Sequence, residues 1–314
     1  MSTSARMKPT LKPARRPAAV VTGTSSGIGR ACALRLAGEG YHVFAGVRRR
    51  QHGQALVQEA SRNGGQLTPV ILDVTDEASI RTAAAEVADS VGDAGVAVLV
   101  NNAGIGMTWP VEAVPLADLR HIYEVNVFGQ VAVTQAFLPL IRACAGRVVN
   151  VGSIGDRLSL PFGAPLVSSK WAFASITESL RMELRPWGIH VVLIEPATIQ
   201  TDAVKKVKED AERVMSKMTP ADLELYGETY QAMTRKAIER ASSGSDPDVV
   251  ARAVLRAARK KRPRTRYVVG KDGRLLAFLA GWAPDRLFDA MRIRLFGLPK
   301  KFGAAAQPVN GVVR

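Results

Sequence analysis

A glycine-rich segment near the N-terminus has the composition of a phosphate-binding loop. Residues 22–29 read Thr-Gly-Thr-Ser-Ser-Gly-Ile-Gly, between a short apolar run and a helical pattern. Glycine lets the backbone turn sharply and approach a pyrophosphate, and the N-terminus of the next helix offers free N–H groups to that anion. A triphosphate loop is excluded because no Gly-Lys-Ser/Thr follows. The segment predicts a dinucleotide site that includes Gly23, Ser25, Ser26, Gly27, Ile28 and Gly29.

The residues after the next apolar run indicate which dinucleotide binds. Residues 43–47 are followed by three arginines, residues 48–50, and by no acid. An acid at this place would bind the ribose 2′-hydroxyl of NAD, whereas arginine accommodates the 2′-phosphate of NADP. The sequence therefore favours NADP(H) over NAD(H), held by Arg48 and Arg49; a solvated basic turn is the alternative. Asp73, next to Val74, either accepts a hydrogen bond from the adenine amine or caps a helix.

A regular alternation of elements would position these loops. Apolar runs at residues 18–22, 43–47, 70–72, 96–100, 147–151 and 190–194 predict strands covered on both faces. Helical patterns lie between them, at about residues 27–39, 52–62, 76–91, 118–143 and 165–186. Strand alternating with helix predicts an α/β fold with a parallel sheet. Residues 248–261 predict another helix and residues 266–269 a last strand.

Further motifs, in this order and spacing, give the chain a family resemblance. With the loop at residues 22–29 and Asp73, the motifs Asn101–Gly104, Asn126, Ser153, Lys170 and Pro196 resemble those of the short-chain dehydrogenase/reductase family over about residues 18–202. The surroundings of residues 194–196 look similar to the branch that acts on steroids and retinoids. The resemblance implies a doubly wound, Rossmann-type parallel sheet of about seven strands in the order 3-2-1-4-5-6-7. It also implies hydride transfer between NAD(P)(H) and a small-molecule alcohol or ketone, in a homodimer or homotetramer.

The resemblance also implies residue roles. Ser153 would hydrogen-bond the substrate oxygen, Lys170 would bind the nicotinamide ribose, and Asn126 would hold a water in a proton relay. A buried, satisfied asparagine and a solvated helix lysine are the plain alternatives for Asn126 and Lys170. The resemblance adds six cofactor contacts: Asn102, Ala103, Gly104, Pro196, Thr198 and Thr201. No metal site is expected.

The chain departs from the family's Tyr-x-x-x-Lys signature, because Leu166 stands four residues before Lys170. Positions i and i+4 share one face of a helix, so Leu166 points where the phenol should be. Leucine neither donates nor accepts a proton, and general acid–base catalysis typically contributes about 10²–10⁴-fold. Three interpretations follow: an oxidoreductase with a substitute acid, a cofactor-binding pseudoenzyme that acts as a sensor or partner subunit, or an enzyme disabled by an engineered change. The substitute acids are Ser153, Ser169, a water held by Asn126 and Lys170, Tyr226 or Tyr230.

The net charge is +15 on 314 residues, from 43 Lys and Arg against 28 Asp and Glu. The excess lies at the two ends, and residues 18–250 are slightly acidic. The sequence predicts a disordered basic arm over residues 1–17, one catalytic domain over 18–270 and a basic amphipathic extension over 271–314. No nucleic-acid motif accompanies the charge. The basic stretch at residues 260–266 and the amphipathic stretch at residues 274–296 predict either weak contact with an anionic membrane or a solvated or subunit surface.

Within the catalytic domain, residues 201–242 are polar and rich in Lys, Glu and Met, and their large apolar residues are Met215, Met218, Leu223, Leu225, Tyr226, Tyr230 and Met233. They predict an apolar lid over a lipophilic alcohol or ketone, or else helices that only pack on one another. The two cysteines lie far apart and offer no disulfide framework. The N-terminus carries no apolar secretory signal. We therefore expect a cytoplasmic protein, with the membrane contact as a peripheral option.

Overall fold

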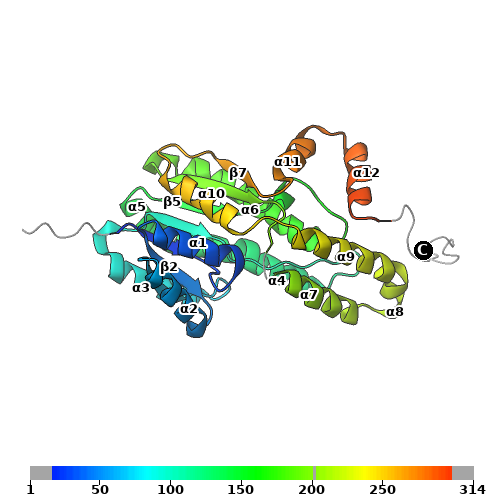
Figure 1. Cartoon of the computed structure of the whole chain (residues 1–314), viewed down its shortest axis with the longest axis horizontal. Coiled ribbons are helices and arrows are strands. Elements are labelled where there is room, and N and C mark those ends of the chain that lie inside the picture. Colours follow the sequence, from blue (N-terminus) through cyan, green and yellow to red (C-terminus); the bar gives the residue numbers. More distant parts are fainter. Residues whose placement is uncertain (1–15, 201–202, 299–314) are drawn as a thin grey trace, which may run out of the picture.

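The computed structural model describes residues 16–200 and 203–298, without the side chains of residues 203–207, and centres on a parallel sheet of seven strands (Figure 1). The strand order is β3-β2-β1-β4-β5-β6-β7, so the predicted Rossmann-type topology is confirmed. The strands are β1 (Ala18–Val21), β2 (His42–Val47), β3 (Gln66–Ile71), β4 (Val98–Asn101), β5 (Arg147–Val151), β6 (His190–Pro196) and β7 (Arg266–Val269).

Helices cover both faces of this sheet because the strands are apolar on both sides. One core joins the sheet to α1 (Gly27–Gly38), α2 (Arg50–Arg62) and α10 (Asp248–Arg259). A second core, on alternate strand residues, joins it to α3 (Glu77–Val91) and α5 (Gly129–Ala143). The end of α6 (Ala164–Glu183) also packs on this second core.

Helices α1 and α10 are tied together although some 210 residues separate them in the chain. Val250 and Val254 of α10 are fully buried in the same core as Cys32 and Leu36 of α1. Two ion pairs join the C-terminal end of α1 to the two ends of α10. Arg35 Nη2 lies 2.6 Å from Asp248 Oδ1, at the start of α10. Arg259 Nη1, at the end of α10, lies 2.6 Å from Glu39 Oε2, the carboxylate that follows α1. The C-terminal part of the domain therefore supports the helix that follows the phosphate loop.

Two elements differ from the sequence prediction. Strand β3 begins at Gln66 rather than at residue 70. It pairs only with β2 and is therefore an edge strand, where Pro69 is tolerated and the apolar run is short. The helix predicted over residues 118–143 is two helices, α4 (Leu116–Tyr123) and α5, joined by a π-helical turn, η2 (Glu124–Phe128).

The remaining longer helices lie toward one end of the sheet (Figure 1). Trp109 and Tyr230 are fully buried in a third core, which joins α7 (Ala203–Lys217) and α9 (Glu228–Ser242) to the loop after β4. Helices α11 (Gly273–Trp282) and α12 (Asp285–Leu295) follow β7. They contact the rest of the fold, because Phe288 of α12 is buried and Arg292 donates to the Ser159 carbonyl at 2.7 Å. The other short elements are α8 (Pro220–Asp222), η1 (Gly92–Ala94), η3 (Ile154–Asp156), η4 (Arg185–Trp187) and η5 (Leu223–Gly227).

Candidate active site

A cleft of about 530 Å³ lies where the loop after β1 meets the loops after β2, β3 and β4. Parallel strands of this topology place their carboxyl ends at one edge of the sheet, where ligands bind. Leu166, His121 and Asp210 also line the cleft, from α6, α4 and α7. Twelve of the predicted cofactor residues line it: Gly23, Ser25, Ser26, Gly27, Ile28, Gly29, Arg48, Asp73, Val74, Asn102, Ala103 and Gly104.

The loop after β1 has the geometry that an anion needs. Gly23 and Gly27 have φ values of +68° and +54°, which side-chain-bearing residues rarely adopt. Helix α1 begins at Gly27, and the side chain of its N-cap, Ser26, makes no capping hydrogen bond. The first N–H groups of a helix have no partner within the helix. They are therefore available to a phosphate in the cleft.

A side-chain amide braces the same loop. Asn102 Nδ2 donates to the carbonyl oxygens of Thr22 and Gly23, at 3.0 and 3.2 Å. Its backbone N–H donates to Thr22 Oγ1 at 2.9 Å. A Cβ on Gly29 would lie 2.2 Å from the Gly23 oxygen and 2.4 Å from Asn102 Nδ2. Only a glycine at position 29 lets these three segments close on one another.

The arginines after β2 separate into two positions. Arg48 lines the cleft, is exposed and makes no ion pair with a described residue. Arg49 is the N-cap of α2 and does not line the cleft. The sequence predicted both arginines as cofactor contacts. Because the chain turns into α2 at Arg49, Arg48 is the one of the two that reaches the cleft.

The carboxylate after β3 is not the cap of α3. Asp76 is the N-cap, and its side chain accepts from the N–H groups of Ala78 and Ser79. Asp73 Oδ1 instead accepts from the backbone and hydroxyl of Thr75, at 3.0 and 2.8 Å. These bonds orient Asp73, which lines the cleft.

Asn126 lies in the π-helical turn η2, behind the turn that follows β4. Its Nδ2 donates to the Ile105 carbonyl and to Ser169 Oγ, both at 3.0 Å, and its Oδ1 accepts from the Ile105 N–H at 2.9 Å. A Cβ on Gly104 would lie 3.2 Å from Asn126 Oδ1, so Asn126 lies directly beside this residue of the cleft lining. The amide is satisfied within the protein and holds the Gly104–Ile105 turn in place.

Lys170 reaches the same turn from α6. Its Nζ donates to the Val151 carbonyl at 3.3 Å and lies 3.6 Å from the point that a Cβ on Gly104 would occupy. Burial lowers the pKa of Lys170 to about 8. Desolvation disfavours the charged form of an amine. Lys170 therefore loses its proton more readily than an exposed lysine does.

Ser153 follows β5 and caps the short helix η3. Its Oγ accepts from the N–H of Gly155 at 3.0 Å, which leaves the hydroxyl proton without a partner among the described residues. A hydroxyl so oriented can donate to a carbonyl oxygen. By contrast, Ser169 donates its proton to the Leu166 carbonyl at 2.7 Å. Ser153 is therefore the better donor of the two serines.

Leu166 occupies the place predicted for it. It lines the cleft one helical turn before Lys170, and its Cδ2 lies 3.7 Å from the point that a Cβ on Gly106 would occupy. No tyrosine from the segment at residues 201–242 replaces the missing phenol. The Tyr230 hydroxyl bonds to Thr108 Oγ1 at 2.8 Å in the third core, and the Tyr226 hydroxyl bonds to Glu112.

The remaining predicted contacts lie after β6. Pro196 is buried at the end of the strand, and Thr198 forms an isolated bridge with Lys271. Neither of them lines the cleft, and Thr201 lies outside the described residues. Ser153, Asn126 and Lys170 also lie behind the lining. These six residues stay predictions as contacts to cofactor or substrate.

Sequence reasoning missed a buried carboxylate, Asp156, three residues after Ser153. Its side chain is fully buried, and neither carboxyl oxygen accepts a hydrogen bond from a described residue, although Arg266 Nη1 lies 3.6 Å from Oδ1. Burial raises the pKa of Asp156 to about 8, and the neighbouring Glu195 carboxylate adds to the shift. Two adjacent carboxyl groups bond to each other only when one keeps a proton. A proton kept on Asp156 gives it a donor toward Glu195.

Two arginines stabilise the charged partner of this pair. Arg157 Nε lies 2.7 Å and Arg266 Nη1 2.5 Å from Glu195 Oε1. Burial opposes ionisation of Glu195, but the hydrogen bonds and charges of these arginines outweigh it and hold the pKa of Glu195 below its usual range. Of the two carboxyl groups, Asp156 is thus the one that keeps its proton to higher pH.

Asp156 should make the folded chain less stable as the pH rises. Between about pH 4 and 8 the folded chain keeps a proton on Asp156 that the unfolded chain has lost, so the free energy of unfolding falls with pH. Asp156→Asn keeps the shape and donates to Glu195 without titrating. In urea denaturation at pH 8, we expect the free energy of unfolding of the variant to exceed that of the wild type by on the order of 1 kcal/mol or more. Near pH 4 the two free energies should be equal.

The matched control for this experiment is Asp93→Asn, at an exposed carboxylate. It should leave the pH dependence of unfolding unchanged. An Asp156→Asn variant whose stability advantage is the same at both pH values would contradict a shared proton.

The family model, the relatives and the solved structure that match this chain all point to one family. A family model for "short chain dehydrogenase" matches residues 17–212. The NADPH-dependent 3-dehydrocapnine reductase of Ornithobacterium rhinotracheale is 34% identical, over 86% of this chain and 94% of its own. Human retinol dehydrogenase 16 is 34% identical, over 90% of this chain and 89% of its own. The crystal structure of a short-chain dehydrogenase from Streptomyces avermitilis superposes with a TM-score of 0.69 at 28% identity, over 90% of this chain and 96% of its own.

Proposed function

Because this chain belongs to the short-chain dehydrogenase/reductase family, in its retinol and steroid dehydrogenase branch, we propose that it is an NADP(H)-dependent oxidoreductase of alcohols and ketones. The observation that carries the proposal is the cleft itself. A helix N-terminus without a side-chain cap, a glycine loop and Arg48 line it together with Leu166. The NADPH-dependent relative supports the choice of NADP(H).

The residues present fit the cofactor. The N–H groups at the start of α1 would bind the pyrophosphate, Arg48 the 2′-phosphate and Asp73 the adenine amine. The bound nicotinamide would supply the hydride, or accept it. Lys170 would donate to the adjoining ribose and carry a positive charge beside the reacting carbon. Ser153 would donate its hydroxyl proton to the substrate oxygen.

The site would work slowly for lack of a proton donor. Ser153 holds the substrate oxygen, but a serine hydroxyl is a poor acid, and Leu166 supplies no proton. We therefore propose slow turnover, with the proton coming through water from Lys170. The hydroxyls of Tyr226 and Tyr230 are hydrogen-bonded to Glu112 and Thr108, so neither phenol replaces the missing acid. This favours a second candidate, an NADP(H)-binding pseudoenzyme that acts as a sensor or partner subunit.

Cofactor binding and turnover test these candidates together. NADPH should raise the melting temperature of the full chain more than NADH does. Oxidation of NADPH with a panel of lipophilic ketones then separates a slow enzyme from a pseudoenzyme. If neither cofactor stabilises the protein, both candidates are wrong.

Arg48→Ser should change the cofactor preference. A hydrogen bond to a charged group contributes about 1.5–3 kcal/mol, so the variant should bind NADPH about 10–100-fold more weakly. Its NADH affinity should stay unchanged, because NADH lacks the 2′-phosphate. Titration followed by cofactor fluorescence measures both constants.

Arg49→Ser is the matched control, since Arg49 is equally exposed but does not line the cleft. Equal losses in the two variants would assign the 2′-phosphate to diffuse positive charge rather than to Arg48.

The surrounding segments complete the proposal. We propose that residues 18–270 act as one catalytic domain, that the segment at residues 201–242 closes over a lipophilic substrate, and that two or four copies associate in the cytoplasm. Asp210 of α7 lines the cleft, while Met218, Tyr230 and Met233 pack in the third core. No helix within the described residues is long and apolar enough to cross a membrane. We further propose that residues 274–296 contact an anionic membrane from its surface.

A further inference from the structure

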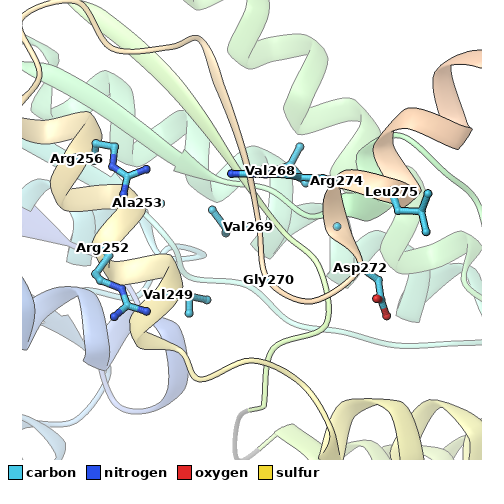
Figure 2. Close-up of a pocket in the computed structure, with 11 residues that line it drawn as sticks. Val249, Arg252, Ala253, Arg256, Val268, Val269, Gly270, Asp272, Arg274 and Leu275 are labelled. Carbon is cyan, nitrogen blue, oxygen red and sulfur yellow. The ribbon is translucent and has the colours of Figure 1, made fainter.

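A second pocket, of about 400 Å³, lies between α10, β7 and α11 (Figure 2). Val268 and Val269 of the edge strand β7 lie between Arg252 and Arg256 on one side and Arg274 on the other. It shares no lining residue with the cofactor cleft.

The charge of this pocket is positive and largely uncompensated. Arg256 and Arg274 form no ion pair with any residue that the structure describes. Arg252 lies 3.5 Å from Asp248, whose carboxylate is shared with Arg35. The one acid in the lining, Asp272, lies 3.8 Å from Arg240, outside the pocket.

Three guanidinium groups with one paired acid are suited to a phosphate group. Arginine binds phosphate oxygens through two parallel N–H bonds and is weakly hydrated. Arg252 and Arg256 are spaced i, i+4 and so lie on one face of α10. A phosphate monoester, with up to two negative charges, would offset most of the excess charge.

An apolar ridge adjoins the arginines. Leu275 lines the pocket, and with Phe278 and Trp282 it follows the i, i+3, i+7 spacing of one helical face. These side chains are 60%, 61% and 80% exposed. Large apolar side chains gathered beside basic ones are typical of surfaces that enter a lipid headgroup layer.

We propose that this pocket binds the phosphate group of an anionic phospholipid while the face of α11 formed by Leu275, Phe278 and Trp282 enters the membrane surface. The inference names the lipid group for the membrane contact proposed above, and it does not depend on the oxidoreductase activity. The positive charge of the pocket favours a phosphate group, and the exposed apolar side chains beside it favour a phosphate that belongs to a lipid.

The test uses sedimentation of the full chain with vesicles of phosphatidylcholine, with or without phosphatidic acid. Arg252→Gln/Arg256→Gln/Arg274→Gln should weaken binding to phosphatidic acid vesicles by at least about tenfold, since each basic residue at an anionic surface contributes about 1 kcal/mol. The control Lys260→Gln/Lys261→Gln/Arg262→Gln removes the same charge from exposed residues outside the pocket. It should weaken binding by less than about threefold.

Further variants distinguish a lipid phosphate from free inorganic phosphate. Phe278→Ser/Trp282→Ser should reduce vesicle binding without affecting a thermal shift by inorganic phosphate. Equal losses in the two charge variants, or no preference for phosphatidic acid, would overturn the proposal. If the protein bound inorganic phosphate through the pocket arginines but did not bind vesicles, the ligand of the pocket would be free phosphate and not a lipid. An unchanged NADPH-induced shift in every variant would show that the proteins are folded and that the outcome is separate from the cofactor site.

Discussion

Replacing Leu166 with tyrosine should raise the rate of NADPH-dependent ketone reduction by about 10²–10⁴-fold, which is the range of general acid–base catalysis. Leu166 lines the cleft on the face of α6 that carries Lys170 one turn later. A phenol at this position would donate its proton to the substrate oxygen. The nearby ammonium of Lys170 would stabilise the phenolate that remains.

Leu166→Phe is the control, because it adds the same ring without a hydroxyl. The phenylalanine variant should leave kcat at the level of the unmodified chain, with at most a change in KM. A rise in kcat that is equal for Tyr and Phe would mean that ring packing, and not proton donation, limits the reaction. Turnover by the unmodified chain at the rate of Leu166→Tyr would mean that another group already supplies the proton.

Gly29→Ala should abolish tight cofactor binding. The added methyl group would meet the Gly23 carbonyl oxygen at 2.2 Å, and a backbone oxygen cannot move aside as a flexible side chain can. The loop would have to open, at a cost of about 1–3 kcal/mol in stability. Loss of even one or two charge-assisted bonds to the pyrophosphate weakens binding by about 100-fold. Thermal unfolding and NADPH titration measure the two effects.

The same helix provides a matched control in Gly38→Ala. Gly38 ends α1 and is exposed, and a methyl group added to it would meet no neighbouring side chain or loop within 4 Å. Alanine there should leave NADPH affinity unchanged and raise stability slightly, by up to about 1 kcal/mol. If Gly29→Ala bound NADPH as tightly as Gly38→Ala, the pyrophosphate could not lie against the Gly23–Gly29 loop.

The sequence was most informative where one residue type is physically required. The glycines of the loop at residues 22–29 predicted the phosphate loop, and the apolar runs predicted a parallel sheet. The order of the strands came from the family resemblance. The π-helical turn at Asn126 was not predictable, because a continuous helix has the same apolar pattern. Strand β3 was underestimated because an edge strand needs fewer apolar residues.

Pairings across the fold were the part that sequence could not supply. Asp156 gives no local sign of its raised pKa, since Glu195 lies 39 and Arg266 110 residues further along the chain. Likewise, nothing local assigns the Tyr230 hydroxyl to Thr108 or separates Arg48 from Arg49. These residues become neighbours only through the arrangement of the strands in the folded sheet, which a local stretch of sequence does not encode.

The tie between α1 and α10 has a consequence for the order of events during synthesis. The strand and helix that form the phosphate loop leave the ribosome first, but the buried face of α1 needs Val250 and Val254. A nascent chain that ends before Asp248 lacks both this apolar cover and the partner of Arg35. Contacts between such distant segments form late because the long loop between them must close first. We expect nascent chains to acquire NADPH affinity only after α10 has been translated, so binding of the nucleotide would report that α1 has received its distant cover.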